Sequence, residues 1–118
     1  MTISIDGIYA GYMTASEGNG FAMFVFLNGL ISGSDPGGVL FDGRYEANEG
    51  GFEAHVRVSV PSGGTVIQGA SAGPAGMQYE VNMQLTPDFF ERDYVRLETP
   101  LGPVNLTLKK IRSLESAV

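Results

Sequence analysis

The sequence has no cysteine and no tryptophan, and it has one histidine, His55. Without cysteine there are no disulfides, no thiolate metal ligands and no cysteine nucleophiles. A metal site would need His55 together with carboxylates such as Glu53 and Glu80, and no ligand spacing supports one. A serine triad would also need His55, but no Gly-x-Ser-x-Gly elbow is present. We therefore expect no metal, no cofactor and no enzymatic activity.

Long hydrophobic runs and basic charge are also scarce. The longest apolar run, residues 21–27, is far shorter than the roughly 20 residues of a membrane-spanning helix. Seven Lys and Arg stand against thirteen Asp and Glu, and the net charge of -6 repels polyanions. The first residues lack the pattern of a secretory signal. These absences predict a cytoplasmic protein that binds neither nucleic acid nor membrane.

Glycine, by contrast, is abundant at 17 of 118 residues. Turn-forming residues recur at roughly 8 to 12 positions, which is typical of many short strands. Apolar side chains alternate strictly with polar ones in 52–60 and 77–85, as in half-buried strands. After Thr86-Pro87, residues 88–92 are predicted to form one helical turn. The predicted strands are 7–15, 20–27, 30–33 resuming at 39–46, 52–60, 65–69, 77–85, 94–99 and 104–111.

About eight strands with mostly short connections predict an all-β fold, an antiparallel meander within a single domain spanning residues 1–118. Closure of the meander into a small lipocalin-like β-barrel would remove unpaired strand edges. An open two-sheet sandwich fits the same periodicity. The segment GASAGPAG, residues 69–76, has little apolar surface to pack and is predicted to be a mobile loop.

The glycine-rich stretch LNGLISGSDPGG, residues 27–38, is predicted to contain turns. Asn28-Gly29 is the dipeptide favoured in a tight hairpin turn. Asp35-Pro36-Gly37-Gly38 predicts a bend or bulge within the third strand. A phosphate-binding loop would instead need a lysine and a Ser or Thr at the start of a helix. The stretch therefore does not predict nucleotide binding.

The segment 21–27 is apolar on both faces, so one face meets the core and the other needs a cover. Exposed apolar patches usually mark protein contacts, which favours a homodimer. The alternative covers are an apolar small molecule inside the barrel and the segment around Phe89 and Phe90. The candidates for the dimer interface or for contact with a ligand are Phe21, Met23, Phe24, Val25 and Phe26.

Ordered motifs in the first half of the chain are similar to those of the GrlR-like proteins, small bacterial proteins named for a negative regulator of type III secretion. The motifs are Asp6-Gly7-Ile8-Tyr9, Gly18-Asn19-Gly20-Phe21, Asn28-Gly29-Leu30-Ile31-Ser32-Gly33-Ser34-Asp35 and Phe41-Asp42-Gly43-Arg44-Tyr45. The second half matches only as a strand pattern. The resemblance implies a lipocalin-like barrel that dimerises and binds a protein partner without catalysis.

In that family, a hairpin turn of four consecutive acids engages a transcriptional activator and keeps it from DNA. The corresponding turn here is Glu46-Ala47-Asn48-Glu49, which keeps only the outer two acids. The resemblance therefore implies Glu46, Asn48 and Glu49 as the partner-binding residues. The loss of two charges weakens electrostatic steering toward a basic partner.

Overall fold

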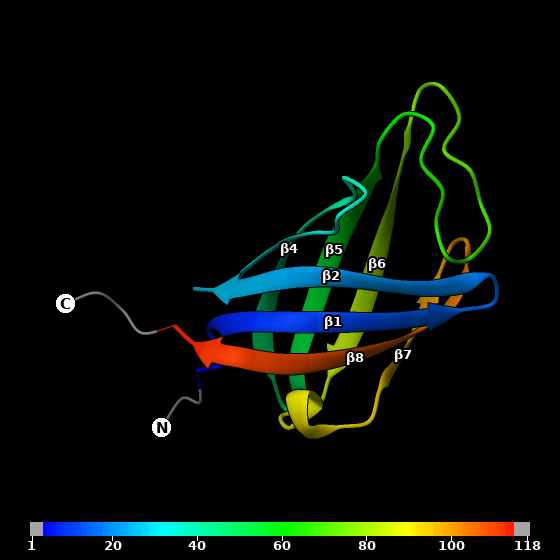
Figure 1. Cartoon of the computed structure of the whole chain (residues 1–118). Coiled ribbons are helices and arrows are strands. Elements are labelled where there is room, and N and C mark those ends of the chain that lie inside the picture. The colour runs from blue at the N-terminus through cyan, green and yellow to red at the C-terminus, as the bar shows by residue number, and fades with distance from the viewer. Residues whose placement is uncertain (1–3, 115–118) are drawn as a thin grey trace.

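The computed structural model describes residues 4–114 as one eight-stranded antiparallel sheet that curls into a nearly closed barrel (Figure 1). Within these residues the only helix is the short 3-10 helix η1 (Phe89–Glu91). The predicted all-β meander is confirmed. The strands are β1 (Gly7–Ala15), β2 (Gly18–Leu27), β3 (Leu30–Ser34), β4 (Leu40–Asn48), β5 (Gly51–Val60), β6 (Met77–Leu85), β7 (Val95–Thr99) and β8 (Gly102–Ser113).

The strand order β6-β5-β4-β3-β2-β1-β8-β7 leaves β6 and β7 at the two ends of the sheet. Strands β1 and β8 pair with each other, so that Gly7 lies opposite Ser113. Strands β6 and β7 approach each other across what we call the β6–β7 seam, where the described residues form no strand ladder. Because all eight strands belong to one curved sheet, the barrel and not the two-sheet sandwich describes this chain.

The predicted third strand is wrong, because the structure divides it into β3 and β4. These strands pair with each other in antiparallel register, and Ser34 lies opposite Leu40. Asp35 Oδ1 accepts hydrogen bonds from the backbone N–H groups of Gly37, at 2.8 Å, and Val39, at 3.0 Å. Gly38 then adopts a positive φ of 92°. The aspartate turn and this glycine reverse the chain completely, whereas a bulge would only have bent it.

The tight turn predicted at Asn28-Gly29 is confirmed. Both residues have positive φ, 50° and 83°, and Leu27 lies opposite Leu30. This geometry belongs to the hairpin turns whose twist matches that of the flanking strands. It fixes the register of β2 against β3, and therefore which side chains of the two strands share a face.

The strand predicted at 65–69 is also wrong. These residues lie in the β5–β6 loop, residues 61–76, whose only ladder contact is an isolated bridge between Thr65 and Ser71. The loop folds back on itself, because Val66 N–H donates to the Ala70 carbonyl and Gly69, with φ of 102°, turns the chain. The segment therefore reverses too early to form a ladder with another strand. The mobility of residues 69–76 stays a prediction.

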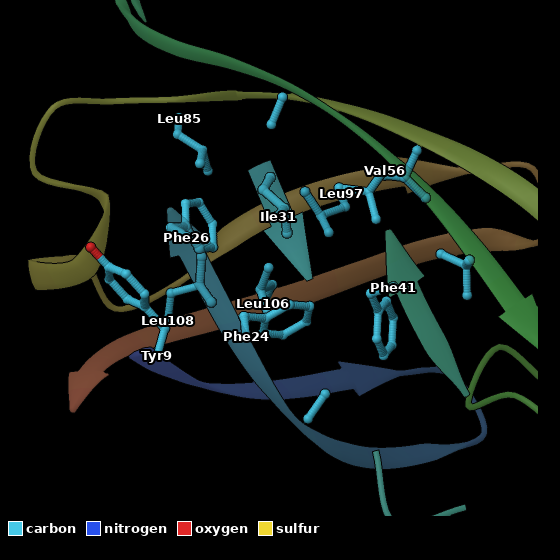
Figure 2. Packing of buried hydrophobic residues seen from close by; sticks show 14 of the residues in the cluster. Tyr9, Phe24, Phe26, Ile31, Phe41, Val56, Leu85, Leu97, Leu106 and Leu108 are labelled. Carbon is cyan, nitrogen blue, oxygen red and sulfur yellow. The ribbon is translucent and has the colours of Figure 1, made fainter. Parts of the chain in front are cut away.

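The core lies inside the barrel and is built from alternate residues of the strands. Figure 2 shows side chains from β1, β2, β3, β4, β5 and β8 converging on the same interior. Phe24 and Phe41 pack with ring centroids 5.1 Å apart, which joins β2 to β4 across the core. Strand alternation therefore directs one face of each strand into a shared apolar interior.

Aromatic side chains close one end of the barrel. The predicted helical turn is confirmed as η1, which places Phe89 against the barrel with no exposed surface. The Phe89 ring centroid lies 5.6 Å from that of Tyr9, 5.9 Å from that of Phe26 and 5.4 Å from that of Phe90. Phe52 lies at 6.4 Å in an edge-on arrangement. We call these five residues the aromatic plug.

Candidate functional site

Strand β2 presents its apolar residues to two different environments. Phe24 and Phe26 point inward and are buried, whereas Phe21 and Met23 are 38% and 37% exposed. Val25 alternates with Phe24 and Phe26 and therefore shares the outer face with Met23. The five candidates do not form one surface, because successive strand residues point to opposite faces. Phe21, Met23 and Val25 remain candidates for an interface, and Phe24 and Phe26 for contact with an interior ligand.

The outer face of β2 continues onto its two neighbouring strands. Tyr12 of β1 lies opposite Phe21, with ring centroids 5.3 Å apart, and Leu30 of β3 lies opposite Leu27. Tyr12 and Leu30 are 49% and 64% exposed, so this face presents large apolar side chains to the solvent. We define the outer apolar patch as Ile8, Tyr12, Phe21, Met23, Val25, Leu27 and Leu30.

Tyr12 and Leu30 also belong to this patch and were not among the residues predicted from the sequence. The signal was available, because the Asn28-Gly29 turn places Leu27 directly opposite Leu30. Tyr12 follows from the alternation of β1, in which Tyr9 is buried and residues at odd separations from it face outward. The turn type therefore places Leu27 and Leu30 on one face, whereas the outward direction of Tyr12 requires the observed burial of Tyr9.

A cavity of about 120 Å³ lies inside the barrel, between the core and the β5–β6 loop. Its wall is mainly aliphatic and aromatic, and includes Met13, Phe24, Phe41, Val58 and Met83. Tyr79, one of the alternating apolar positions of 77–85, also lines it. Thr65, Val66, Ile67 and Gln68 of the loop complete the wall. Gln68 could not be predicted, because it lies in a segment interpreted as a strand.

Polar groups cluster where the β5–β6 loop meets the barrel. The Gln68 side-chain amide donates to Thr99 Oγ1 at 3.1 Å and to the Tyr79 hydroxyl at 3.5 Å. The backbone N–H of Glu17, in the β1–β2 turn, donates to the Ile67 carbonyl at 3.0 Å. Burial raises the pKa of Tyr79, and the hydrogen bond from Gln68 partly offsets that rise. Tyr79 therefore stays protonated at neutral pH and can act as a donor.

The partner-binding turn predicted at 46–49 lies further along the chain, at 49–50, because Glu46 and Asn48 belong to β4; Glu46, Asn48 and Glu49 are all exposed. Asn48 is engaged within the chain, since its side-chain amide exchanges hydrogen bonds of 2.9 and 3.0 Å with that of Gln84. Glu46 lies opposite Glu53 of β5, which is also exposed. Glu53 was not predicted as part of this site, because its proximity to Glu46 depends on the strand register. Three acids therefore lie at this end of the hairpin.

His55 lies on the outer face of β5. Its Nδ1 is 2.6 Å from Asn82 Oδ1, and its Nε2 is 3.4 Å from Glu53 Oε1. Within residues 4–114, no three His, Asp or Glu side chains are arranged to hold a metal ion. His55 is therefore a hydrogen-bonded side chain at the surface.

In the part of the chain that the structure describes, no helix is long and apolar enough to cross a membrane.

Asp6 connects the segment before β1 to two later parts of the chain. Its Oδ1 accepts hydrogen bonds from the Tyr45 hydroxyl at 2.6 Å and from the Asn28 backbone N–H at 3.2 Å. Burial and the contact with Asp6 raise the pKa of Tyr45 from 10.0 to about 12, although a backbone contact with Gly29 opposes the rise. This cluster predicts a measurable alkaline pH dependence of stability.

We expect the Tyr45→Phe variant to lose less stability than the natural protein between pH 10 and about pH 12. Over this range Tyr45 ionises more readily in the unfolded chain, so its stabilising contribution is complete below pH 10 and declines as pH rises. At pH 7 the variant should be less stable, because Asp6 loses a partner. Urea unfolding at pH 7, 10 and 11 measures both effects. Parallel declines of the two proteins above pH 10 would contradict the assignment.

Compared with known proteins, the chain matches no family model, and no curated protein matches its sequence. Function must therefore be inferred from the geometry. Three features carry that inference: the outer apolar patch, the acidic end of the β4–β5 hairpin, and the interior cavity.

Proposed function

We propose that the protein is a non-enzymatic, cytoplasmic protein-binding module that acts as a homodimer. The outer apolar patch is its subunit interface, and the acidic end of the β4–β5 hairpin contacts a basic protein partner. The observation that carries the proposal is the exposure of large apolar side chains on neighbouring strands, among them Tyr12, Leu30 and Met23. Contiguous exposed apolar patches usually mark interaction sites.

The composition of the patch supports protein contact. Tyr12 and Phe21 provide two rings in mutual contact, and Met23 lies beside them on the same face. Aromatic residues and Met are enriched at the centres of protein interfaces. The patch lies on β1, β2 and β3, which have a hydrogen-bonded strand on either side, so the surface is held in a defined shape. A two-fold dimer would bring this surface against its own copy.

The acidic end remains available in such a dimer, because β4 and β5 lie beyond β3 in the strand order. Glu46, Glu49 and Glu53 are exposed there. This charge favours a partner with a basic surface. The resemblance to GrlR-like proteins supports a partner that is a transcriptional activator, which the protein would sequester from DNA. The net charge of -6 is consistent with competition against DNA for such a surface.

Met23→Lys is expected to convert a dimer into a monomer, with the dimer dissociation constant rising roughly 30-fold or more. The substitution places a charge at the centre of the outer apolar patch, where dimerisation would remove its hydration. Native mass spectrometry across a concentration series measures the effect. The matched control is Gln78→Lys, which adds the same charge to an exposed position on β6. A monomeric natural protein, or a Met23→Lys dimer of unchanged affinity, would refute the interface.

The second arm of this experiment tests the partner. The natural protein, Gln78→Lys and the double variant Glu46→Lys/Glu49→Lys serve as baits in cells of the source organism, with captured proteins identified by mass spectrometry. The first two baits should retain a basic DNA-binding protein that the charge-reversed bait loses. Equal retention of that protein by all three baits would refute the acidic end as the contact.

A further inference from the structure

The interior cavity is separate from both surfaces used in the proposed function. It lies inside the barrel, whereas Tyr12, Met23 and Leu30 point away from the interior. Figure 2 shows Phe24 and Phe41 projecting toward the shared interior from β2 and β4, and both line the cavity. Protein interiors are otherwise packed as densely as organic crystals. A cavity of about 120 Å³ is therefore a feature whose size and chemistry can be compared with those of a ligand.

The size of the cavity limits the ligand to about one ring. An apolar engineered cavity of about 150 Å³ stays dry and binds benzene. The cavity here, at about 120 Å³ and with a similarly apolar wall, is slightly smaller. Pockets for drug-sized molecules are larger, at roughly 300 to 1,000 Å³. The volume between the walls is therefore matched to a single ring.

The chemistry of the wall selects a neutral ligand. Among residues 4–114, Asp35 is the only charged residue that lines the cavity. Its Oδ1 already accepts hydrogen bonds from Gly37 and Val39 within the β3–β4 turn. No Lys or Arg of this described part of the chain lines the cavity to compensate an anion. An anion would lose its hydration without a countercharge, and a cation would meet only Asp35, whose Oδ1 is already engaged in the turn, so either charge is costly in this apolar interior.

At the end of the cavity next to the β5–β6 loop, the Tyr79 hydroxyl favours a particular functional group on the ring. The Tyr79 hydroxyl accepts a hydrogen bond from Gln68, but within residues 4–114 its own proton has no acceptor. The nearby Thr99 hydroxyl already donates to the Gly102 carbonyl at 2.6 Å. Partly buried hydroxyl groups usually use their donors. A hydrogen-bond acceptor on the ligand would complete the bonding of Tyr79.

The β5–β6 loop provides the route of entry. The opposite end of the barrel is closed by the aromatic plug, in which Phe89 is fully buried. No residue of the loop is fully buried, and Gly63, Gly69, Gly73 and Gly76 all have positive φ. The contacts of Ile67 with Glu17 and of Gln68 with Thr99 hold it against the barrel. Val66, Ile67 and Ala72 of the loop pack against the core while staying partly exposed, and elements with few fully buried contacts open at lower free-energy cost than the core strands.

We propose that the cavity binds a neutral single-ring molecule with one hydrogen-bond acceptor directed at Tyr79, and that the β5–β6 loop is the lid through which this molecule enters. The ligand is held by apolar contact with the wall and oriented by the Tyr79 hydroxyl. The site is independent of the outer apolar patch, so one can fail experimentally while the other stands.

The test uses the methionine methyl groups as reporters in ¹³C NMR. Met13 and Met83 line the cavity, whereas Met23 belongs to the outer apolar patch. The probes are benzonitrile, a neutral ring with an acceptor; toluene, which lacks the acceptor; and benzoate, which is charged. Benzonitrile should shift the Met13 and Met83 signals and leave Met23 unchanged. Its affinity should exceed that of toluene by roughly 2- to 10-fold, and benzoate should not bind.

Two variants assign the contacts. Tyr79→Phe should reduce benzonitrile affinity to that of toluene and leave toluene affinity unchanged, because only the hydroxyl is removed. Val58→Phe places a larger side chain in the wall and should abolish binding of both rings while the barrel keeps its fold. Absence of Met13 and Met83 shifts at millimolar probe would overturn the site. Benzoate binding would overturn the neutral class, and equal benzonitrile and toluene affinities would overturn the acceptor contact.

Discussion

Phe89→Ala is expected to lower the free energy of unfolding by about 3 to 5 kcal/mol, the largest effect among the substitutions considered. Phe89 has no exposed surface, and its ring contacts those of Tyr9, Phe26 and Phe90. Truncation removes these contacts and leaves a void at the end of the barrel. Tyr9 and Phe26 belong to β1 and β2, and the ladder between these strands limits how far the two rings can collapse into the void. Urea denaturation at pH 7 measures the loss.

The matched control for this prediction is Tyr94→Ala. Tyr94 is an aromatic residue in the same connection between β6 and β7, but it is 55% exposed. Its truncation should cost less than about 1 kcal/mol, because little apolar contact is lost. If the two variants were equally stable, the aromatic plug would not be a structural element of the barrel.

Gly43→Ala is expected to cost about 1 to 3 kcal/mol or more, although it adds only one methyl group. A Cβ at position 43 would overlap the His55 carbonyl oxygen and lie 2.9 Å from Val56 Cα. Both atoms belong to the backbone of β5, which is paired with β4 at this point. The methyl group can be accommodated only if the two strands move apart. Thermal and urea unfolding of the purified variant measure the cost.

Gly20→Ala controls for the general effect of a glycine substitution in a strand. A Cβ at position 20 would meet only side-chain atoms, the nearest being Ile67 Cγ2 at 3.5 Å. The change should alter stability by no more than about 0.5 kcal/mol, since alanine is also less flexible than glycine in the unfolded chain. Equal losses from both substitutions would show that the approach of β4 to β5 is not what requires Gly43.

The strands that could be predicted best are those whose two faces differ in polarity. In β5 the apolar residues alternate with Glu53, His55 and Arg57. The strand itself and the face to which each side chain points could therefore both be predicted. The error at β3 and β4 had a different origin. Asp35-Pro36-Gly37-Gly38 is compatible with a bend and with a full reversal, and only the pairing of Ser34 with Leu40 distinguishes them. That pairing is a tertiary property and is absent from local turn preferences.

The residues of the candidate sites likewise differ in whether the sequence could predict them. The apolar character of β2 was evident, but both of its faces are apolar, so the sequence could not assign Phe24 inward and Met23 outward. Gln68 was hidden for another reason. Its contact with Thr99 joins the β5–β6 loop to the turn between β7 and β8, and no short-range pattern predicts such a meeting.

The β6–β7 seam and the β1–β8 ladder have opposite consequences for folding speed. Strands β6 and β7 follow one another in the chain, and the connection of residues 86–94, which contains η1, keeps them near each other even without a ladder. Strands β1 and β8 are the first and last strands of the chain. Their ladder therefore requires closure of a loop that contains all the remaining strands, β2 to β7. Loop closure entropy must be offset before such distant contacts stabilise the chain, which slows folding. The hairpins can therefore form early, whereas the completed barrel must wait for its most distant pair of strands.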